Sequence, residues 1–449
     1  MEPQKNSDAM GFVQTIKNIW KIEDLRQRLL ITIGFVAIYR FGSFVVLPGI
    51  NPEALVALQS NASTGLLSLL DMFSGGAFAN ASIFALGIMP YISASIVMQL
   101  LGIAVPAFQK MQREGESGRT KINQYTRYLT VGILILQGPA YLYGAVGSAI
   151  PGGFWDWVLP STVILAGGSM FVLWLGERIT DKGIGNGISF IILIGIIARL
   201  PHALVAEYDR LIDAPGGLIL LLLELLFLVA VTAAAILLVQ GIRKVPVQYA
   251  KRIVGNKQYG GVRQYIPLKV NAANVMPIIF AQAIMFIPLT IAKFSAGEGG
   301  GFWTQLMDFT SFWYNFIFAT LIIAFTYFYT AITVNPVQMA EDLKRNNGFI
   351  PGVKPGKKTA EYIDTIMSRI TLPGSVFLAI VAILPAFAGL MGINSQFAQF
   401  FGGTSLLILV GVVLDTLQQI ESHLLMRHYD GFLKSGAKIK GRTGSIAAY

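Results

Sequence analysis

The sequence predicts an all-α polytopic membrane protein with ten membrane-spanning helices. Of its residues 54% are hydrophobic and only 13% are charged, which is too apolar for a soluble protein of 449 residues. Stretches of about 20 mostly apolar residues, the length that crosses roughly 30 Å of hydrocarbon, recur along the chain. The predicted spans are residues 29–47, 78–103, 128–149, 157–176, 184–201, 217–240, 272–293, 312–334, 370–391 and 402–422.

Basic residues indicate how these spans are oriented. All but four of the 34 Lys and Arg residues lie in the two terminal segments and in the loops after the even-numbered spans. Because Lys and Arg accumulate on the cytoplasmic side, both termini are predicted to be cytoplasmic. Residues 12–28 mix both charges with apolar residues, which predicts an amphipathic helix on the membrane surface. The four exceptions are Arg40, Arg199, Arg210 and Lys293.

The composition argues against several kinds of site. The chain has no cysteine, which excludes disulfides, thiolate metal ligands and cysteine nucleophiles. Its three histidines match no metal-site spacing, and we interpret them as ordinary interfacial side chains. Residues 352–359 are one residue short of a phosphate loop, and 183–187 lack the βαβ setting of a dinucleotide site. We therefore expect no catalytic residues, no metal and no cofactor.

The short segment 63–76, STGLLSLLDMFSGG, is predicted to lie on the external side. Its apolar run is too short to span the membrane. Thr64 is suited to cap the start of a helix, and Gly75 with Gly76 to end it. From the residues alone, a helix lying on the outer leaflet is modestly favoured over a re-entrant helix inside the protein.

Two long cytoplasmic loops differ from simple connections. Residues 241–270 hold seven basic residues and no acidic one, and paired runs around a Gly-Gly pair predict a β-hairpin. Residues 335–364 carry both charges and several turn-forming Gly and Pro residues. Membrane topology and anionic lipid headgroups would account for the charge. Long ordered loops are usually functional, so docking of an anionic partner is somewhat favoured.

Within the spans, one stripe and three charges stand out. Ile88, Ile92 and Ile96 are spaced by four and therefore share one helical face, beside polar neighbours that include Gln99. Lipid contact does not require such a stripe, so this helix is expected to face something else. The main ionisable residues at membrane depth are Arg40, Glu224 and Asp415, for which pairing within the bundle is at least as good an interpretation as a functional role.

Several long stretches resemble the SecY family of protein-conducting channels. They are DMFSGGAFANASIFALGIMPYISASIVMQLL, GIGNGIS, KVPVQYAKR, NPVQMAEDLKRNNGFIPGVKPG and GGTSLLILVGVVLDTLQQIESHLLMRHYDGFLK. The resemblance covers nearly the whole chain. It implies two pseudo-symmetric five-helix halves, residues 1–205 and 206–449, arranged as a clamshell around an hourglass pore. It also favours the re-entrant interpretation of segment 63–76, which matches the family's plug.

The resemblance further implies a role for particular residues. An aliphatic ring that narrows the pore would comprise Ile92, Ile96, Ile188, Ile192, Ile279 and Ile408. The plug would comprise Leu66, Leu67, Leu69, Leu70, Asp71, Met72 and Phe73. Gln99 and Gln282 could line a lateral gate between the second and seventh spans, although packing is an equal alternative. Docking of a motor or ribosome would use Arg243, Lys244, Lys251, Arg252, Lys354, Lys357 and Lys358.

The implied partners are the small membrane subunits SecE and SecG, the motor ATPase SecA, the ribosome, the accessory proteins SecDF and YidC, unfolded substrate chains and the lipid bilayer. The family usually has arginine where this chain has Lys354, and lysine lacks the planar fork that binds in a bidentate manner.

The residues alone leave two other functions open. One is a secondary transporter, which should show charged or unwound ligands at mid-membrane, and the other is a scaffold or insertase without a pore.

Overall fold

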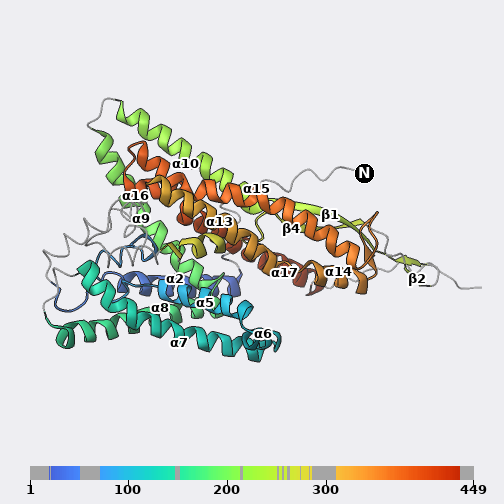
Figure 1. The fold of residues 1–449 in the computed structure, drawn as a ribbon, viewed down its shortest axis with the longest axis horizontal. Coiled ribbons are helices and arrows are strands. Elements are labelled where there is room, and N and C mark those ends of the chain that lie inside the picture. The colour runs from blue at the N-terminus through green and yellow to red at the C-terminus, as the bar shows by residue number, and fades with distance from the viewer. Residues whose placement is uncertain are drawn as a thin grey trace, which may run out of the picture.

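The computed structural model describes residues 20, 22–50, 71–146, 152–212, 216–249, 252–254, 257–259, 263–273, 275–282, 284–285 and 310–434. The described chain is mainly helical (Figure 1). Its helices are α2 (Glu23–Gly42), α5 (Met89–Ala104), α6 (Pro106–Arg113), α7 (Glu116–Tyr141), α8 (Leu159–Lys182), α9 (Gly187–Ile212), α10 (Gly217–Gln240), α13 (Phe312–Thr333), α14 (Pro336–Arg345), α15 (Lys357–Leu390), α16 (Ser395–Ala398) and α17 (Gly403–Lys434).

Six helices in the described part of the chain are long and apolar enough to cross a membrane, or up to seven if the bent pair α5 and α6 forms one span. These six contain α8, α9, α10, α13, α15 and α17. The helices α2 and α7 occupy the first and third predicted spans but are more polar. Nearly half of the seventh predicted span lies outside the described residues. The structure thus supports a multi-pass helical membrane protein, and the count of ten stays a prediction.

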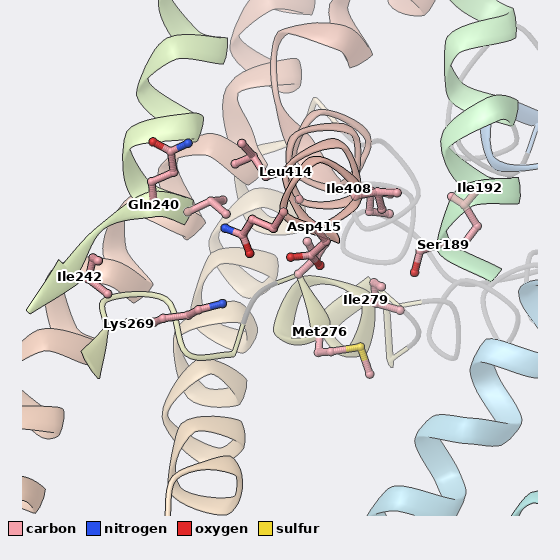
Figure 2. A pocket seen from close by; sticks show the side chains of 15 residues that line it. Ser189, Ile192, Gln240, Ile242, Lys269, Met276, Ile279, Ile408, Leu414 and Asp415 are labelled. Carbon is pink, nitrogen blue, oxygen red and sulfur yellow. The ribbon is translucent and has the colours of Figure 1, made fainter. Parts of the chain in front are cut away.

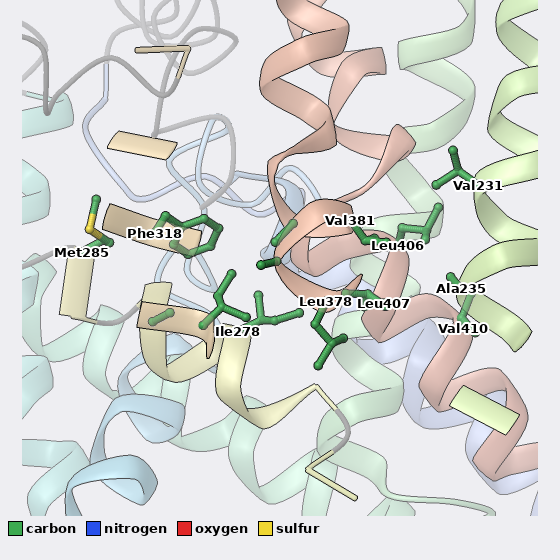
Figure 3. Close-up of a cluster of buried hydrophobic side chains, with 14 of the residues drawn as sticks. Val231, Ala235, Ile278, Met285, Phe318, Leu378, Val381, Leu406, Leu407 and Val410 are labelled. Atoms are coloured by element: carbon green, nitrogen blue, oxygen red, sulfur yellow. The ribbon is translucent and has the colours of Figure 1, made fainter. Parts of the chain in front are cut away.

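The helices form two packed groups with α9 between them (Figure 1). One group buries apolar side chains between α10, α13, α15 and α17, together with residues 275–285 (Figure 3). In the other group α2 packs on α8, and α7 packs on α5 and α8. Helix α9 contacts α2 and α8 on one side and α10 and α17 on the other. This arrangement fits two halves, although the boundary at residue 205 stays a prediction.

The second predicted span begins later than the sequence suggests. Residues 78–88 form turns, and the helix starts at Met89 rather than at residue 78. The backbone explains this, because Ala81 and Gly87 have φ angles of 44° and 51°, which a helix does not allow. In addition, Ile83 donates a backbone hydrogen bond to Val45, which ties these turns to the chain after α2. The apolar composition of 78–88 therefore reflects burial in the protein rather than a helix.

The first predicted span also differs. Helix α2 runs without a break from Glu23 to Gly42, so the C-terminal part of the predicted surface helix 12–28 continues into the span. Residues 12–19 lie outside the described residues. Acidic side chains in the first turn of α2 favour its start there through the helix dipole.

The predicted cytoplasmic hairpin is present. Strand β1 (Ile242–Tyr249) pairs antiparallel with β4 (Arg263–Lys269), and β2 (Arg252–Val254) pairs with β3 (Lys257–Tyr259). The short strand β5 (Gly348–Phe349) adds to the other edge of β1, which gives the order β4-β1-β5. The described part of the fold is therefore helical with two small sheets.

The two cytoplasmic loops pack into one unit. Val245, Val247 and Leu268 of the hairpin are buried against Leu343 of α14 and Ile363 of α15. Because α15 already begins at Lys357, the end of the predicted loop, residues 357–364, is the first part of a 34-residue helix that continues into the membrane. A force applied to the hairpin can therefore be transmitted to the spanning helix α15 through this packed apolar core.

Candidate functional site

An apolar cluster joins residues from both packed groups of helices. Its fully buried members include Met72, Phe73, Ile192 and Ile408, and the partly buried Ile92, Ile188 and Ile279 pack against it. The isoleucines come from four separate segments: α5, α9, residues 275–285 and α17. No single helix could bury these side chains alone, so the cluster forms where these segments meet. We refer to it as the apolar constriction, after the narrowing that the family resemblance predicts.

Five of the six isoleucines assigned to the pore ring thus lie in one cluster. On α9, Ile188 and Ile192 are one turn apart and share a face. Ile96 is also buried, but among the described clusters it belongs to none that contains the other five. The role of these side chains as a pore ring stays a prediction, and the structure adds that Met72 and Phe73 fill the space beside them.

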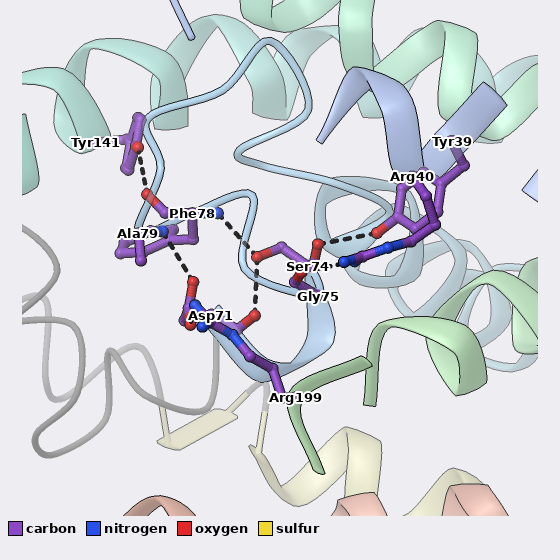
Figure 4. A network of polar contacts seen from close by, with 9 residues as sticks. All are labelled: Tyr39, Arg40, Asp71, Ser74, Gly75, Phe78, Ala79, Tyr141 and Arg199. Carbon is purple, nitrogen blue, oxygen red and sulfur yellow. Dashed lines mark hydrogen bonds and ion pairs between the residues drawn. The ribbon is translucent and has the colours of Figure 1, made fainter. Parts of the chain in front are cut away.

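The C-terminal part of the predicted plug segment 63–76 is fixed by polar contacts (Figure 4). The Asp71 carboxylate pairs with the Arg199 guanidinium and accepts a hydrogen bond from the Ala79 N–H at 2.8 Å. Burial raises the pKa of the Asp71 carboxyl above its ordinary value, and the Arg199 charge opposes that rise. The plug residues Leu66, Leu67, Leu69 and Leu70 lie outside the described residues.

Helices α2 and α7 hold the same segment from two other sides. The Tyr39 hydroxyl donates to the Ser74 carbonyl at 3.0 Å, and Arg40 Nη1 donates to the Gly75 carbonyl at 2.7 Å. The Tyr141 hydroxyl donates to the Phe78 carbonyl at 2.8 Å. Backbone carbonyls outside regular structure are satisfied here by side chains, as burial requires. Arg40, which lies within a predicted span, therefore has a hydrogen-bond partner inside the bundle.

The other two charges predicted at membrane depth have different surroundings. Glu224 lies 3.7 Å from the guanidinium of Arg210, which also pairs with the buried Glu207 and donates to the Gly392 carbonyl. This cluster links the end of α9 with α10 and with the turn after α15, and it supports the interpretation of Glu224 as a pairing residue. Asp415 instead faces a cavity.

That cavity, of about 490 Å³, adjoins the apolar constriction (Figure 2). One end is lined by Ile192, Ile279 and Ile408 of the constriction. The other end is lined by Lys269 and Asp415, where α10 and α17 approach the hairpin.

The two glutamines assigned to the lateral gate have local partners. Gln99 Nε2 donates to Ser95 Oγ on its own helix at 3.4 Å. Gln282 is buried, and its Oε1 accepts a hydrogen bond from Thr404 Oγ1 of α17 at 2.8 Å. No described bond joins Gln99 to Gln282. The packing alternative therefore gains support for Gln282, and the gate stays a prediction.

The basic docking residues are exposed where the structure describes their side chains. Arg243 and Lys244 lie at the start of β1, and Lys354, Lys357 and Lys358 lie in the turn before α15 and in its first turn. Lys358 Nζ is 3.0 Å from Glu361 Oε2. Arg252 belongs to β2, whereas Lys251 lies outside the described residues. The shared apolar core brings both groups into one platform.

The sequence did not predict that Arg199 would pair with Asp71 of the plug segment, or that Tyr141 would bind the Phe78 carbonyl just after it. A signal for Arg199 existed, because it is one of only four basic residues outside the predicted cytoplasmic segments. Tyr141 gave no comparable signal, since an interfacial tyrosine in a membrane protein is common.

Several long apolar helices, packed together in two groups, define the class of multi-pass helical membrane proteins. The family model for SecY matches residues 82–417 of the chain. The chain is 44% identical over 440 residues to the protein translocase subunit SecY of Halalkalibacterium halodurans, with 94% of this chain and 100% of the relative covered. It is 40% identical to the same subunit of Mycobacterium bovis over 94% of this chain and 99% of the relative.

Solved structures agree in fold. A structure described as that of a protein conducting channel matches with a TM-score of 0.61 at 17% identity, over 92% of this chain and 95% of the other. Sec61 in a canine ribosome-channel complex matches with a TM-score of 0.57 at 16% identity, over the same fractions. The chain belongs to the SecY family, and it is a protein-conducting channel subunit of the translocase.

Proposed function

We propose that this chain is the central channel of a bacterial translocon in the cytoplasmic (inner) membrane, with both termini in the cytoplasm. It passes unfolded secretory chains across the membrane and releases transmembrane segments sideways into lipid. Ten spans in two halves, residues 1–205 and 206–449, surround an hourglass pore. The observation that carries this proposal is the contact of Met72 and Phe73 with isoleucines of α5, α9, residues 275–285 and α17.

The proposed ring works because isoleucine contacts are non-directional. A channel for chains of any sequence needs a constriction that neither binds particular residues nor leaks ions. Hydrogen-bonding side chains would be selective, whereas an aliphatic ring adapts to the chain and excludes water when it is empty. Met72 and Phe73 of the plug add apolar contacts to the closed ring. The gate glutamines, Gln99 and Gln282, would separate when a segment leaves for the lipid.

The chain is proposed to act without a catalytic site of its own, so a partner must supply the energy. The exposed basic platform of the hairpin and the α15 start suits the motor SecA, through acidic side chains, and the ribosome, through phosphate. Structures of channels in ribosome-bound complexes share this fold. SecE and SecG would complete the channel in the membrane, with SecDF and YidC as accessory partners.

Deletion of residues 64–74 tests the proposal. The purified channel complex should remain assembled, because the apolar core between α10, α13, α15 and α17 contains none of residues 71–74. In planar bilayers the deleted channel should open repeatedly in the absence of substrate, while the complete channel stays closed. If the deleted channel is as tight as the complete one, the segment is not a plug.

A further inference from the structure

Helix α9 presents a mixed stripe to the centre of the molecule. Ile188, Ile192, Gly195 and Arg199 are spaced by four, three and four residues, so they share one helical face. The two isoleucines belong to the apolar cluster described above. Gly195 and Arg199 contact the segment that begins at Asp71.

At Gly195 the backbone of α9 touches the backbone of this segment. A Cβ atom on Gly195 would lie 2.8 Å from the Phe73 carbonyl oxygen and 3.2 Å from the Gly75 nitrogen. Gly75 has a φ of +64°, and a Cβ atom there would lie 2.8 Å from the Cα of Gly195. Both contacts are below what real Cβ atoms tolerate, and they involve backbone atoms that cannot rotate away. The segment is therefore seated here because both positions are glycine.

One turn further along α9, Arg199 adds a charge. Its guanidinium pairs with Asp71, whose side chain is only 8% exposed. The same guanidinium lies against Gly76, where an added Cβ would be 3.1 Å from Arg199 Cζ. Removing one partner of such a pair leaves the other charge buried without compensation, which is strongly unfavourable. The contact therefore favours the seated position of the segment over a displaced one.

We propose that Gly195 and Arg199 form a latch on α9 that holds residues 71–76 in the closed channel and couples ring widening to plug release. The coupling follows from the stripe, because Ile192 and the latch residues are carried by the same helix. A substrate that widens the constriction by displacing α9 also withdraws the seat and the guanidinium from the plug. This inference rests on the plug function proposed above.

Conductance of the purified complex in planar bilayers tests the latch. Gly195→Ala and Arg199→Gln should each raise the substrate-free open probability at least tenfold. Arg199→Lys, which keeps the charge, should stay closer to the unchanged channel. The swap of Asp71→Arg with Arg199→Asp should leak less than either single reversal, a rescue that a general packing defect would not give.

Two matched controls make the same kinds of substitution at positions outside the latch. Gly167→Ala alters a glycine of α8 whose added Cβ meets nothing within 4 Å, and Arg127→Gln removes an arginine that pairs with Glu177 at 2.6 Å. Both should remain closed. The latch is refuted if Gly195→Ala and Arg199→Gln stay closed while deletion of 64–74 leaks. If the deletion does not leak, the plug function itself fails. Should Gly195→Ala not assemble, Arg199→Gln and the swap decide alone.

Discussion

Replacing Ile408 by asparagine should loosen the closed channel. Ile408 is 5% exposed, and an amide that stays among its apolar cluster neighbours would find no hydrogen-bond partner among them. Burying an isoleucine side chain is worth roughly 1.5–3 kcal/mol. An unsatisfied buried polar group costs roughly a further 1–3 kcal/mol. The closed state should therefore lose about 2.5–6 kcal/mol relative to a state in which the asparagine is hydrated.

Because about 1.4 kcal/mol corresponds to a factor of ten, the lower bound already shifts the equilibrium between closed and open states by about 60-fold. Single-channel recording of the purified complex should show this as a rise in open probability, and translocation assays should show acceptance of poor signal sequences. Ile408→Val, which keeps an aliphatic side chain, is the matched control and should change little. An Ile408→Asn channel with unchanged leak and unchanged signal stringency would refute a dewetted isoleucine seal.

The remaining predictions concern the cytoplasmic platform. Reversing the charges of Arg243, Lys244, Lys251 and Arg252 together should weaken binding of motor and ribosome severalfold and flatten its salt dependence, since each exposed pair contributes only about 0.2–1 kcal/mol. If the reversed and the unchanged channel show equal affinities and equal salt dependence, these charges serve only membrane topology and lipid contact. Lys354→Arg should alter motor-driven translocation if a bidentate fork matters, and a rate identical to that of the lysine channel would show that charge alone acts. Val247→Asn, at a position 1% exposed in the core between hairpin and α15, should reduce docking without changing any charge, and unaltered binding would show that the platform need not be rigid.

The elements that were predicted from the residues alone depend on local sequence patterns. Hydrophobic length predicted the bounds of α10, because a long and mostly apolar run is flanked there by Gly216 and Gly241. Paired runs around Gly-Gly predicted the hairpin of β1 and β4. The family resemblance brought together five isoleucines that are far apart in the chain, which spacing within one helix could not do.

Other features depend on contacts between distant segments. The turns before Met89 are as apolar as a span, and only their bonding to the chain after α2 shows why they are not helical. The turn-forming residues after Asn335 suggested a loop, yet α15 begins at Lys357 and passes through Pro373 and Pro385. Proline is tolerated there because neighbouring helices satisfy the freed backbone groups. The seat at Gly195 could not be predicted, since a glycine in a helix does not reveal which backbone touches it.

The central claim, that substrate chains cross this protein through its isoleucine constriction, is tested most directly by site-specific crosslinking. Photoreactive residues are placed singly at Ile92, Ile192, Ile279 and Ile408, and at the lipid-facing Leu222 of α10 as a control, which is 68% exposed. A secretory chain is then arrested during translocation. The account predicts crosslinks from the four constriction positions and none from Leu222. Crosslinking from Leu222 with none from the constriction would contradict it.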